Sequence, residues 1–358
     1  MKNKKTLLFW GELPPTVFHG ISISNERILS ALASEFDIYT VEDRGSFGGR
    51  LKALLSFFIS TIKLGCLSLR KFDIYYINMP MSYLGLWKVY ISVSCIKFLS
   101  SSTKVITHLH RGDFLDFIEL SRNKKLLKYF LNRVDLVLTL SETSKSELVE
   151  SELIKANKAQ VLHNSILVLK DKAKILNNIP NEFQHSNFYC LCNYIPTKRI
   201  HRLVEIANEI PLTGIIFNGA AETKEYMQSL AVLDIGNICS FNGVVNGVEK
   251  ERLLNEAKAL VLPSLNEGMP LVILESLAQS TPVICYDIGY IRDYVGSEYP
   301  GLVKELTNKA LKEKIEWLQA LPPQEYLALR KKSFDLFWNN YEVNKVNSLA
   351  LKIFQGLI

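Results

Sequence analysis

The sequence lacks the long apolar runs by which membrane-spanning proteins are recognised. Its longest uncharged apolar stretches, 53–62 and 89–96, are bounded by lysines well before the roughly 20 residues that a transmembrane helix requires. The basic start, Met1–Lys5, resembles a signal peptide, but the apolar run after it is short and continues into Gly11 and two prolines. We therefore predict a first β-strand here and no transmembrane helix in the chain.

Motifs for metals, dinucleotides and serine nucleophiles are also missing. The six cysteines are scattered, without a Cys-x-x-Cys pair or histidines at zinc-binding spacing, so most are expected to be small apolar core residues of a cytosolic protein. No Asp-x-Asp pair occurs, and we expect no metal or other cofactor. The absence of Gly-x-Gly-x-x-Gly after the first predicted strand argues against a dehydrogenase, and no nucleophile elbow points to a serine hydrolase. No nucleic-acid-binding module is recognisable, so we expect no nucleic-acid partner.

Acidic residues are scarce in the first half of the chain. Between Arg44 and Gly112 the only acid is Asp73, against ten lysines and arginines, although the whole chain has a net charge of only +6. Within this region, Leu51–Leu69 is apolar with basic residues nearby, as helices at a membrane interface are, and a buried helix with solvated lysines has the same pattern. We expect a cytoplasmic protein that contacts the inner face of the membrane through this basic half.

The residues that are present indicate a folded α/β protein. Hydrophobic residues at 48% and charged residues at 22% are typical of globular proteins, and 358 residues exceed the size of a single core. Short β-rich runs alternate with longer helical patterns, as in parallel βαβ units. We predict strands near 5–10, 37–41, 73–78, 104–110, 135–140, 160–163, 187–192, 214–218, 238–241, 259–262 and 282–286.

These strands divide into two Rossmann-like, doubly wound α/β domains. The strand pattern is lost over 166–186, which gathers the turn formers Asn177, Asn178, Pro180 and Asn181. We predict an acceptor-binding domain over 1–168, a linker over 169–186, a donor-binding domain over 187–340, and a helix over 341–358 that packs back on the first domain. Because ligands bind outside the carboxyl ends of parallel strands, two such sheets facing across a cleft are expected to bind their ligands in that cleft.

Two glutamates separated by seven residues occur three times, as Glu142/Glu150, Glu305/Glu313 and Glu267/Glu275. Only the last pair has a distinctive context. The strand at 259–262 precedes it, and Gly268-Met269-Pro270-Leu271 then opens a helix with Glu275 about two turns from its start. Free N–H groups and the helix dipole at such a start attract a diphosphate. Without this context, both glutamates would be interpreted as surface residues.

The stretch 262–278, followed by Pro282-Val283-Ile284, resembles the retaining family 4 glycosyltransferases, which have the GT-B architecture. The turn Phe241–Val245 resembles the nucleoside-binding turn of that family, 217–219 the strand end before it, and 194–206 its lysine-bearing loop and helix. The resemblance implies that Glu267 contacts the donor sugar and Glu275 the nucleotide ribose. Carboxylates suit both roles because they accept the hydrogen bonds that hydroxyl groups donate. The resemblance also assigns to donor binding Val245, Gly268, Met269, Pro270, Leu271 and Val272.

The same resemblance implies that Lys198 holds the leaving diphosphate. The family usually has an arginine five residues before this lysine, where this chain has Asn193. Loss of such a cation can cost roughly 2–4 kcal/mol of transition-state stabilisation. Either Arg199 takes its place in the donor site, or the helix termini suffice, or the activity is weak.

In the first predicted domain, Pro14-Pro15 with Gly20 resembles the glycine loop beneath the diphosphate, although the family commonly has Gly-Gly where this chain has His19-Gly20. Gly20 lacks a Cβ, so its backbone could approach a phosphate, and a plain turn glycine is the alternative. The segment 108–111 resembles the family's histidine-bearing strand end, which implies that His110 faces the reacting sugar. His108 lies on the same face of the strand and is expected to be structural, as is His163.

These features predict a retaining glycosyltransferase that moves a sugar from a nucleoside diphosphate sugar to a hydroxyl of a lipid-linked saccharide in bacterial-type surface polysaccharide synthesis. No carboxylate is obviously placed as a covalent nucleophile, which favours substitution on one face of the sugar. Two alternatives remain. One is a nucleotide-sugar epimerase or hydrolase of the same fold, and the other is a non-catalytic partner that has lost turnover, as Asn193 hints.

Overall fold

A computed structural model describes residues 4–17, 19–43, 63, 70–177, 179, 187–211 and 214–358. The chain divides into two compact units: unit 1 contains residues 1–165 and 343–358, and unit 2 contains 166–342. The predicted interfacial segment, Leu51–Leu69, lies outside the described residues except for Lys63. None of the helices within the described ranges is long and apolar enough to cross a membrane.

Unit 1 is built on a six-stranded parallel sheet in the order β2-β1-β3-β4-β5-β6. Its strands are β1 (Lys5–Gly11), β2 (Phe36–Glu42), β3 (Ile74–Asn78), β4 (Lys104–Leu109), β5 (Leu136–Thr139) and β6 (Ala159–Val161). Its helices are α1 (Gly20–Leu32), α3 (Tyr83–Leu99), α4 (Phe114–Glu119), α5 (Ser121–Leu131), α6 (Glu142–Glu150), the short η1 (Ala156–Lys158) and α15 (Val343–Gly356).

Helices cover both faces of this sheet, and strand alternation separates two cores. Leu8 and Trp10 of β1 pack in a cluster with residues of α3, α5 and α6. Leu7 and Phe9, which point the other way, pack in a second cluster with residues of α1 and α15. Strands buried on both faces are apolar at nearly every position, which explains why β1 shows no alternation of apolar and polar residues.

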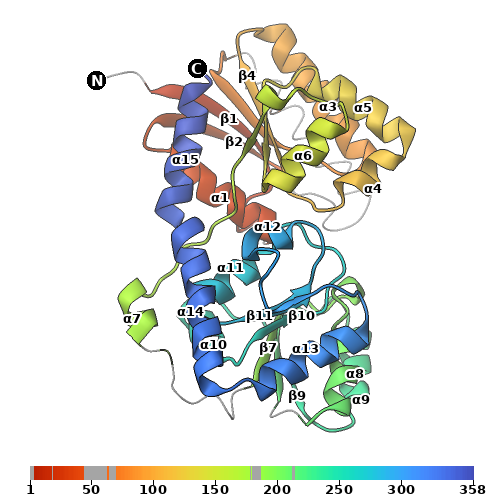
Figure 1. The fold of residues 1–358 in the computed structure, drawn as a ribbon. Coiled ribbons are helices and arrows are strands. Elements are labelled where there is room, and N and C mark those ends of the chain that lie inside the picture. The colour runs from red at the N-terminus through yellow and green to blue at the C-terminus, as the bar shows by residue number, and fades with distance from the viewer. Residues whose placement is uncertain are drawn as a thin grey trace. The chain divides into compact units, whose positions relative to one another are not determined.

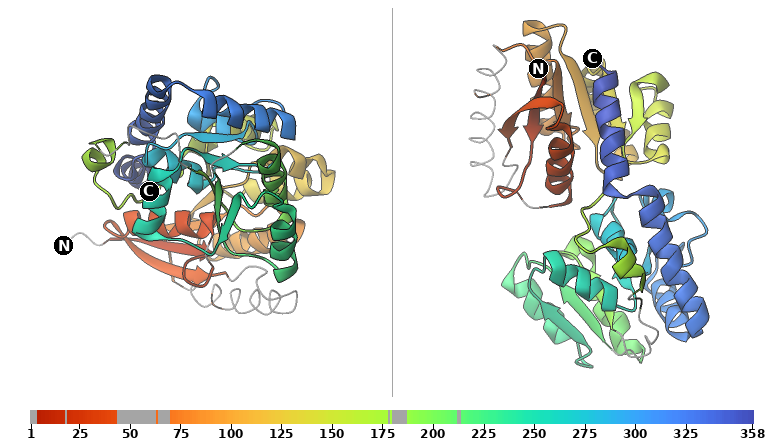
Figure 2. Two further views of the ribbon diagram at one scale, coloured as in Figure 1. Left: turned by 90° about the horizontal axis from the view of Figure 1, so that it is seen from below. Right: turned by 90° about the vertical axis from the view of Figure 1, so that its left-hand side faces the viewer.

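The helix α15 completes the second of these cores. Val346, Ala350, Ile353 and Phe354 are buried there, and the ring of Phe354 meets Tyr76 of β3 edge-on. A hydrogen bond of 2.6 Å from Arg27 Nη1 of α1 to Asn347 Oδ1 adds a polar contact. Figures 1 and 2 show α15, in dark blue, alongside α1.

Unit 2 has a second six-stranded parallel sheet, in the order β12-β11-β10-β7-β8-β9. Its strands are β7 (Phe188–Leu191), β8 (Ile215–Asn218), β9 (Cys239–Asn242), β10 (Leu260–Leu262), β11 (Val283–Tyr286) and β12 (Leu302–Val303). Its helices are α7 (Lys172–Asn177), η2 (Pro196–Lys198), α8 (Ile200–Glu209), α9 (Lys224–Leu233), α10 (Gly247–Glu256), α11 (Leu271–Ala278), α12 (Ile291–Val295), α13 (Asn308–Ala320) and α14 (Pro323–Asn340).

The prediction of two doubly wound α/β sheets is confirmed. Each predicted strand corresponds to one of β1–β11, whereas the two-residue β12 was not predicted. The predicted linker, 169–186, contains α7, and its first residues are fixed to unit 2 by Glu251, whose carboxylate accepts hydrogen bonds from the backbone N–H groups of Leu169 and Lys170 at 2.6 and 3.2 Å.

Candidate functional site

The candidate site of unit 2 lies where its strand order reverses. The strands β8 and β9 extend from one side of β7, whereas β11 and β12 extend beyond β10 on its other side. In open parallel sheets, ligands bind outside the carboxyl ends of the strands at such a switch point. The chain leaving β7 carries Lys198 at the end of η2, and the chain leaving β10 carries Glu267.

Lys198 and Glu267 form an ion pair at this point. The distance from Lys198 Nζ to Glu267 Oε1 is 2.6 Å, and the two side chains are 28% and 11% exposed. The attraction between the two partly buried charges offsets the cost of removing them from water, and an unpaired charge in the same place would keep that cost. A bound anion that attracted Lys198 would release the Glu267 carboxylate to accept other hydrogen bonds.

The start of α11 has no side-chain cap. Pro270 is the N-cap residue and offers no side-chain acceptor to the helix, and the Ile273 N–H donates to the Pro270 carbonyl at 3.1 Å, so the N–H groups of Leu271 and Val272 have no side-chain cap in the described structure. Glu275 is the fifth residue of α11, little more than one turn from its start. The expected position, about two turns into the helix, was therefore wrong.

Glu275 pairs with Lys250, a residue that no motif in the sequence indicates. Lys250 Nζ of α10 lies 2.6 Å from Glu275 Oε1, and both side chains are partly buried. The pair lines a cavity of about 140 Å³ together with Gly247 and Gln279. The Gln279 Oε1 atom is buried without a hydrogen-bond partner among the described groups. The cavity is therefore lined in part by polar groups.

The turns after β8 and β9 are held by hydrogen bonds from within unit 2. Asn218 accepts from Tyr189 Oη at 3.0 Å and donates from Nδ2 to the Gly243 carbonyl at 2.8 Å. Tyr194 Oη donates to the Asn242 carbonyl at 2.5 Å and accepts from the Asn242 N–H at 3.1 Å. These bonds fix the turn that leads to Val245, which was predicted to contact the nucleoside.

Asn193 and Arg199, the two positions that bear on the missing arginine, have their own partners. Asn193 Oδ1 accepts a hydrogen bond from the Ala220 N–H at 3.3 Å, so this side chain ties the loop after β7 to the loop after β8. Arg199 has a left-handed backbone, and its Nη2 donates to Asn308 Oδ1 at 3.2 Å while its guanidinium lies over the Tyr286 ring. Arg199 Nη1 is buried without a hydrogen-bond partner in the described structure.

In unit 1, the two histidines of β4 and its end are buried side by side. Their ring centroids lie 4.0 Å apart, and His108 Nδ1 is 3.0 Å from Tyr76 Oη. Burial, followed by the positive charge of Arg27 and the neighbouring His19, lowers the pKa of His110 to about 3. Burial also holds the pKa of His108 well below its usual value. Both imidazoles are therefore neutral near pH 7.

Gly20 is the first residue of α1, and the side chain before it caps that helix. His19 Nδ1 accepts from the N–H groups of Ile21 and Ser22 at 3.2 and 3.4 Å. The other ring nitrogen, Nε2, lies 2.7 Å from Glu12 Oε2. Because the imidazole already satisfies these N–H groups, a phosphate at the start of α1 would have to displace His19.

No three histidine, cysteine, aspartate or glutamate side chains lie close enough to hold a metal ion in the part of the chain that the structure describes. The pair Glu142/Glu150 frames α6, and Glu142 is bonded to Lys145 on the surface. Glu313 forms a loose surface pair with Lys309. The equal spacing of the three glutamate pairs therefore does not produce equal surroundings.

Part of the chain matches a known protein family. Residues 178–333 match the family described as Glycosyl transferases group 1. The O-antigen chain mannosyltransferase RfbU of Salmonella typhimurium is 25% identical over 244 residues, which are 65% of this chain and 63% of that protein. The alignment thus spans less than two thirds of this curated relative.

Solved structures share the fold over nearly the whole chain. A sucrose-phosphate synthase from Thermosynechococcus elongatus superposes with a TM-score of 0.77 at 16% identity, covering 99% of both chains. Anabaena HepE in complex with UDP and glucose superposes with a TM-score of 0.70 at 16% identity, covering 98% of this chain and 100% of HepE. The fold is therefore GT-B, with two Rossmann-like units.

Proposed function

We propose that the chain, whose residues 178–333 match the family Glycosyl transferases group 1, transfers a sugar from a nucleoside diphosphate sugar to a hydroxyl group of a saccharide acceptor. The observation that carries this proposal is the Lys198–Glu267 pair at the switch point of the second sheet. A lysine and an open helix start suit a diphosphate, and a carboxylate suits sugar hydroxyls. The complex of HepE with UDP and glucose supports a nucleotide sugar as the donor.

In this proposal the bound donor replaces the contact between Lys198 and Glu267 with contacts of its own to each residue. Lys198 turns from Glu267 to the diphosphate, which the N–H groups of Leu271 and Val272 also bind at the start of α11. Glu267, once released, accepts hydrogen bonds from the donor sugar. Glu275 accepts hydrogen bonds from the ribose, and Lys250 keeps its carboxylate in place. The remaining motif residues, Gly268, Met269 and Pro270, shape the loop that brings these groups together.

We propose that the transfer retains the anomeric configuration. The bond between the anomeric carbon and the diphosphate oxygen breaks while the acceptor oxygen bonds to the same face of that carbon. The acceptor proton passes to the departing diphosphate. Lys198 and the first N–H groups of α11 stabilise the negative charge that develops on the leaving group. Transfer is therefore expected to continue in EDTA, and loss of activity on chelation would contradict a metal-free mechanism.

We assign the acceptor to unit 1 and propose that it is a lipid-linked saccharide of surface polysaccharide synthesis. The similarity to an O-antigen chain mannosyltransferase supports this acceptor class. The neutral imidazole of His110 can exchange hydrogen bonds with sugar hydroxyls without adding charge, and its Nε2 has no hydrogen-bond partner among the described groups. We propose that the backbone of Gly20 also binds the diphosphate, which requires the His19 imidazole to move away from the N–H groups that it caps.

The test begins with a screen of nucleotide sugars for thermal stabilisation of the full chain, followed by a transfer assay with the stabilising donor and extracted lipid-linked saccharides.

Glu267→Gln should abolish transfer while nucleoside diphosphate binding survives. Lys198→Met should lower kcat by about 10²–10³, because it removes a charge that acts mainly on the leaving group. Glu275→Ala should weaken nucleoside diphosphate binding by roughly 10- to 100-fold, the equivalent of one hydrogen bond to a charged group. Proton NMR of the first product gives its anomeric configuration.

Glu305→Gln is the matched control, because Glu305 begins another seven-spaced glutamate pair in unit 2 and is exposed. It should leave binding and transfer unchanged. The proposal fails if the Glu267 variant transfers sugar as fast as the unaltered chain. Product formed from the donor without acceptor would indicate an epimerase or hydrolase instead, and binding without any turnover would indicate a non-catalytic partner.

A further inference from the structure

The helix α3 of unit 1 exposes apolar residues where a surface helix usually exposes polar ones. A helix packed on a core normally turns its apolar stripe inward and its charges outward. All the exposed residues of α3 are instead apolar or aromatic: Tyr83, Leu84, Trp87, Ile91, Cys95, Phe98 and Leu99. Leu84 and Phe98 are 81% and 90% exposed.

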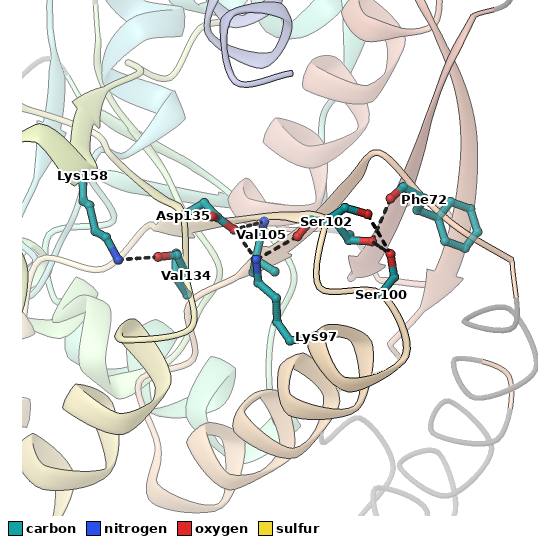
Figure 3. Close-up of polar contacts among 9 residues, drawn as sticks. Phe72, Lys97, Ser100, Ser102, Val105, Val134, Asp135 and Lys158 are labelled. Carbon is teal, nitrogen blue, oxygen red and sulfur yellow. Dashed lines mark hydrogen bonds and ion pairs between the residues drawn. The ribbon is translucent and has the colours of Figure 1, made fainter.

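The lysines of α3 contact other residues of unit 1 and do not extend into solvent. Lys97 Nζ donates to Asp135 Oδ2 at 2.7 Å and to the Thr103 carbonyl at 2.8 Å, and Figure 3 shows this side chain directed at Asp135. Lys88 forms an ion pair with Asp43, and its ammonium lies 4.7 Å from the centre of the Trp10 ring. Both lysines are half-buried, so the exposed face of α3 carries no charge of its own.

The exposed residues form a continuous stripe along α3. With about 100° of rotation per residue, Leu84, Trp87, Ile91, Cys95 and Phe98 fall within an arc of roughly 80°. At about 1.5 Å per residue, Leu84 and Phe98 are roughly 21 Å apart along the helix. Contiguous exposed apolar surface is uncommon on soluble proteins and usually marks an interaction surface.

Next to this stripe, α5 exposes positive charge. The helix α3 packs against α5 (Figure 1), whose exposed residues include Arg122, Lys124, Lys125 and Lys128 and no acid. Two arginines contact the aromatic rings of α3, with Arg122 5.2 Å from the Tyr83 ring centre and Arg133 4.7 Å from that of Tyr90. The shorter α4 also exposes Asp116 and Glu119, so the positive surface is that of α5.

We propose that the exposed face of α3, together with the cations of α5, binds the surface of an anionic lipid bilayer. Apolar side chains of an interfacial helix enter the boundary between headgroups and acyl chains, and neighbouring lysines and arginines attract lipid phosphates. The apolar stripe matches the apolar boundary of the bilayer, and the positive charges beside it are complementary to the negative lipid headgroups. This inference goes beyond the proposed function and does not depend on it, because α3 and α5 belong to unit 1 and the donor site is in unit 2.

The test is sedimentation of the full chain with vesicles of phosphatidylcholine mixed with phosphatidylglycerol, and with vesicles of phosphatidylcholine alone. The unaltered chain should bind the anionic vesicles more tightly than the neutral ones, and salt should weaken this binding. Leu84→Ser combined with Phe98→Ser should lower partitioning about tenfold or more, because two apolar side chains no longer enter the bilayer. Lys124→Gln combined with Lys125→Gln should lower it roughly fivefold for each charge removed.

The matched control is Val232→Ser combined with Ile235→Ser in unit 2, where these side chains are 82% and 81% exposed, and it should bind like the unaltered chain. The proposal is overturned if the unaltered chain binds neither vesicle, or if the Leu84 and Phe98 variant binds as tightly. It is also overturned if light scattering shows that the unaltered chain is a dimer, that the Leu84 and Phe98 variant is a monomer, and that neither binds vesicles. A second copy of the chain would then cover α3. Thermal stabilisation by the donor should be equal in all variants, so failure of the donor site would be seen separately.

Discussion

The buried imidazoles of His108 and His110 give unit 1 a dependence on pH at the scale of single residues. Burial is the largest cause that lowers the pKa of each, and for His110 the result is about 3 against an ordinary value of 6.5. Between these two values the unfolded chain binds a proton that the folded chain does not bind. Folding stability therefore rises with pH through this window and levels off above about pH 6.5.

We predict that the free energy of unfolding falls as the pH is lowered below about 6.5, with His110 contributing about 1.4 kcal/mol for each pH unit. His110→Gln removes this titration, so its stability should fall less steeply between about pH 6.5 and 5. Urea unfolding of both proteins across this range measures the two slopes. Parallel slopes would show that the imidazole of His110 is protonated in the folded chain.

The residues of the donor site were predictable to different degrees. Glu267, Glu275 and Lys198 were identified by their resemblance to a family, and the structure places Lys198 beside Glu267. Lys250 could not be identified from the sequence. Its contact with Glu275 depends on how α10 packs against α11, and no motif or regular spacing in the sequence indicates that packing. The capping role of His19 was also missed, since Ser, Thr, Asp and Asn are the residues expected at that position.

At the scale of elements, the ends of β8 and β9 allow a matched comparison of two glycines. A Cβ on Gly219, after β8, would lie 2.0 Å from the Cys192 carbonyl oxygen, whereas a Cβ on Gly243, after β9, would meet nothing within 4 Å. The first contact is with backbone, so the loop after β7 would have to move.

We predict that Gly219→Ala destabilises unit 2 by about 1–3 kcal/mol or more, the range for overpacking a close contact. Gly243→Ala should change stability by less than about 1 kcal/mol. Thermal unfolding of the two variants beside the unaltered chain tests this difference. Equal effects of the two substitutions would mean that the loops after β7 and β8 do not approach each other this closely.

Strands and helices were predictable where they are long enough to show a pattern. The apolar runs of β1 and β10 were sufficient, and the glycine turn before α11 marked the start of that helix. The strand β12 has only Leu302 and Val303, too few to show a period, and follows Gly301, where a Cβ would lie 1.8 Å from the Val283 carbonyl oxygen. The inward-facing lysines of α3 were also unpredictable, because their acidic partners are distant in the sequence.

At the scale of the whole molecule, unit 1 depends on two separate parts of the chain. Deletion of 343–358 removes Val346, Ile353 and Phe354 from its core and uncovers Leu7 and Phe9. We predict a loss on the order of 5 kcal/mol or more, which approaches the total stability of an ordinary domain. Limited proteolysis should then cleave unit 1 while unit 2 resists.

Deletion of 355–358 alone is the control, since it removes only exposed residues and the partly buried Leu357. Its cleavage pattern should match that of the unaltered chain. If the longer deletion left unit 1 equally resistant, α15 would not be part of its core.

The position of α15 in the chain also affects how the protein is made. The helix leaves the ribosome only after the whole of unit 2, 166–342, has been synthesised. At roughly 5–20 residues per second, the sheet face that α15 covers stays open for on the order of 10–35 s. During translation, the second unit is complete before the first, and the nascent amino-terminal half presents an apolar surface to which chaperones can bind.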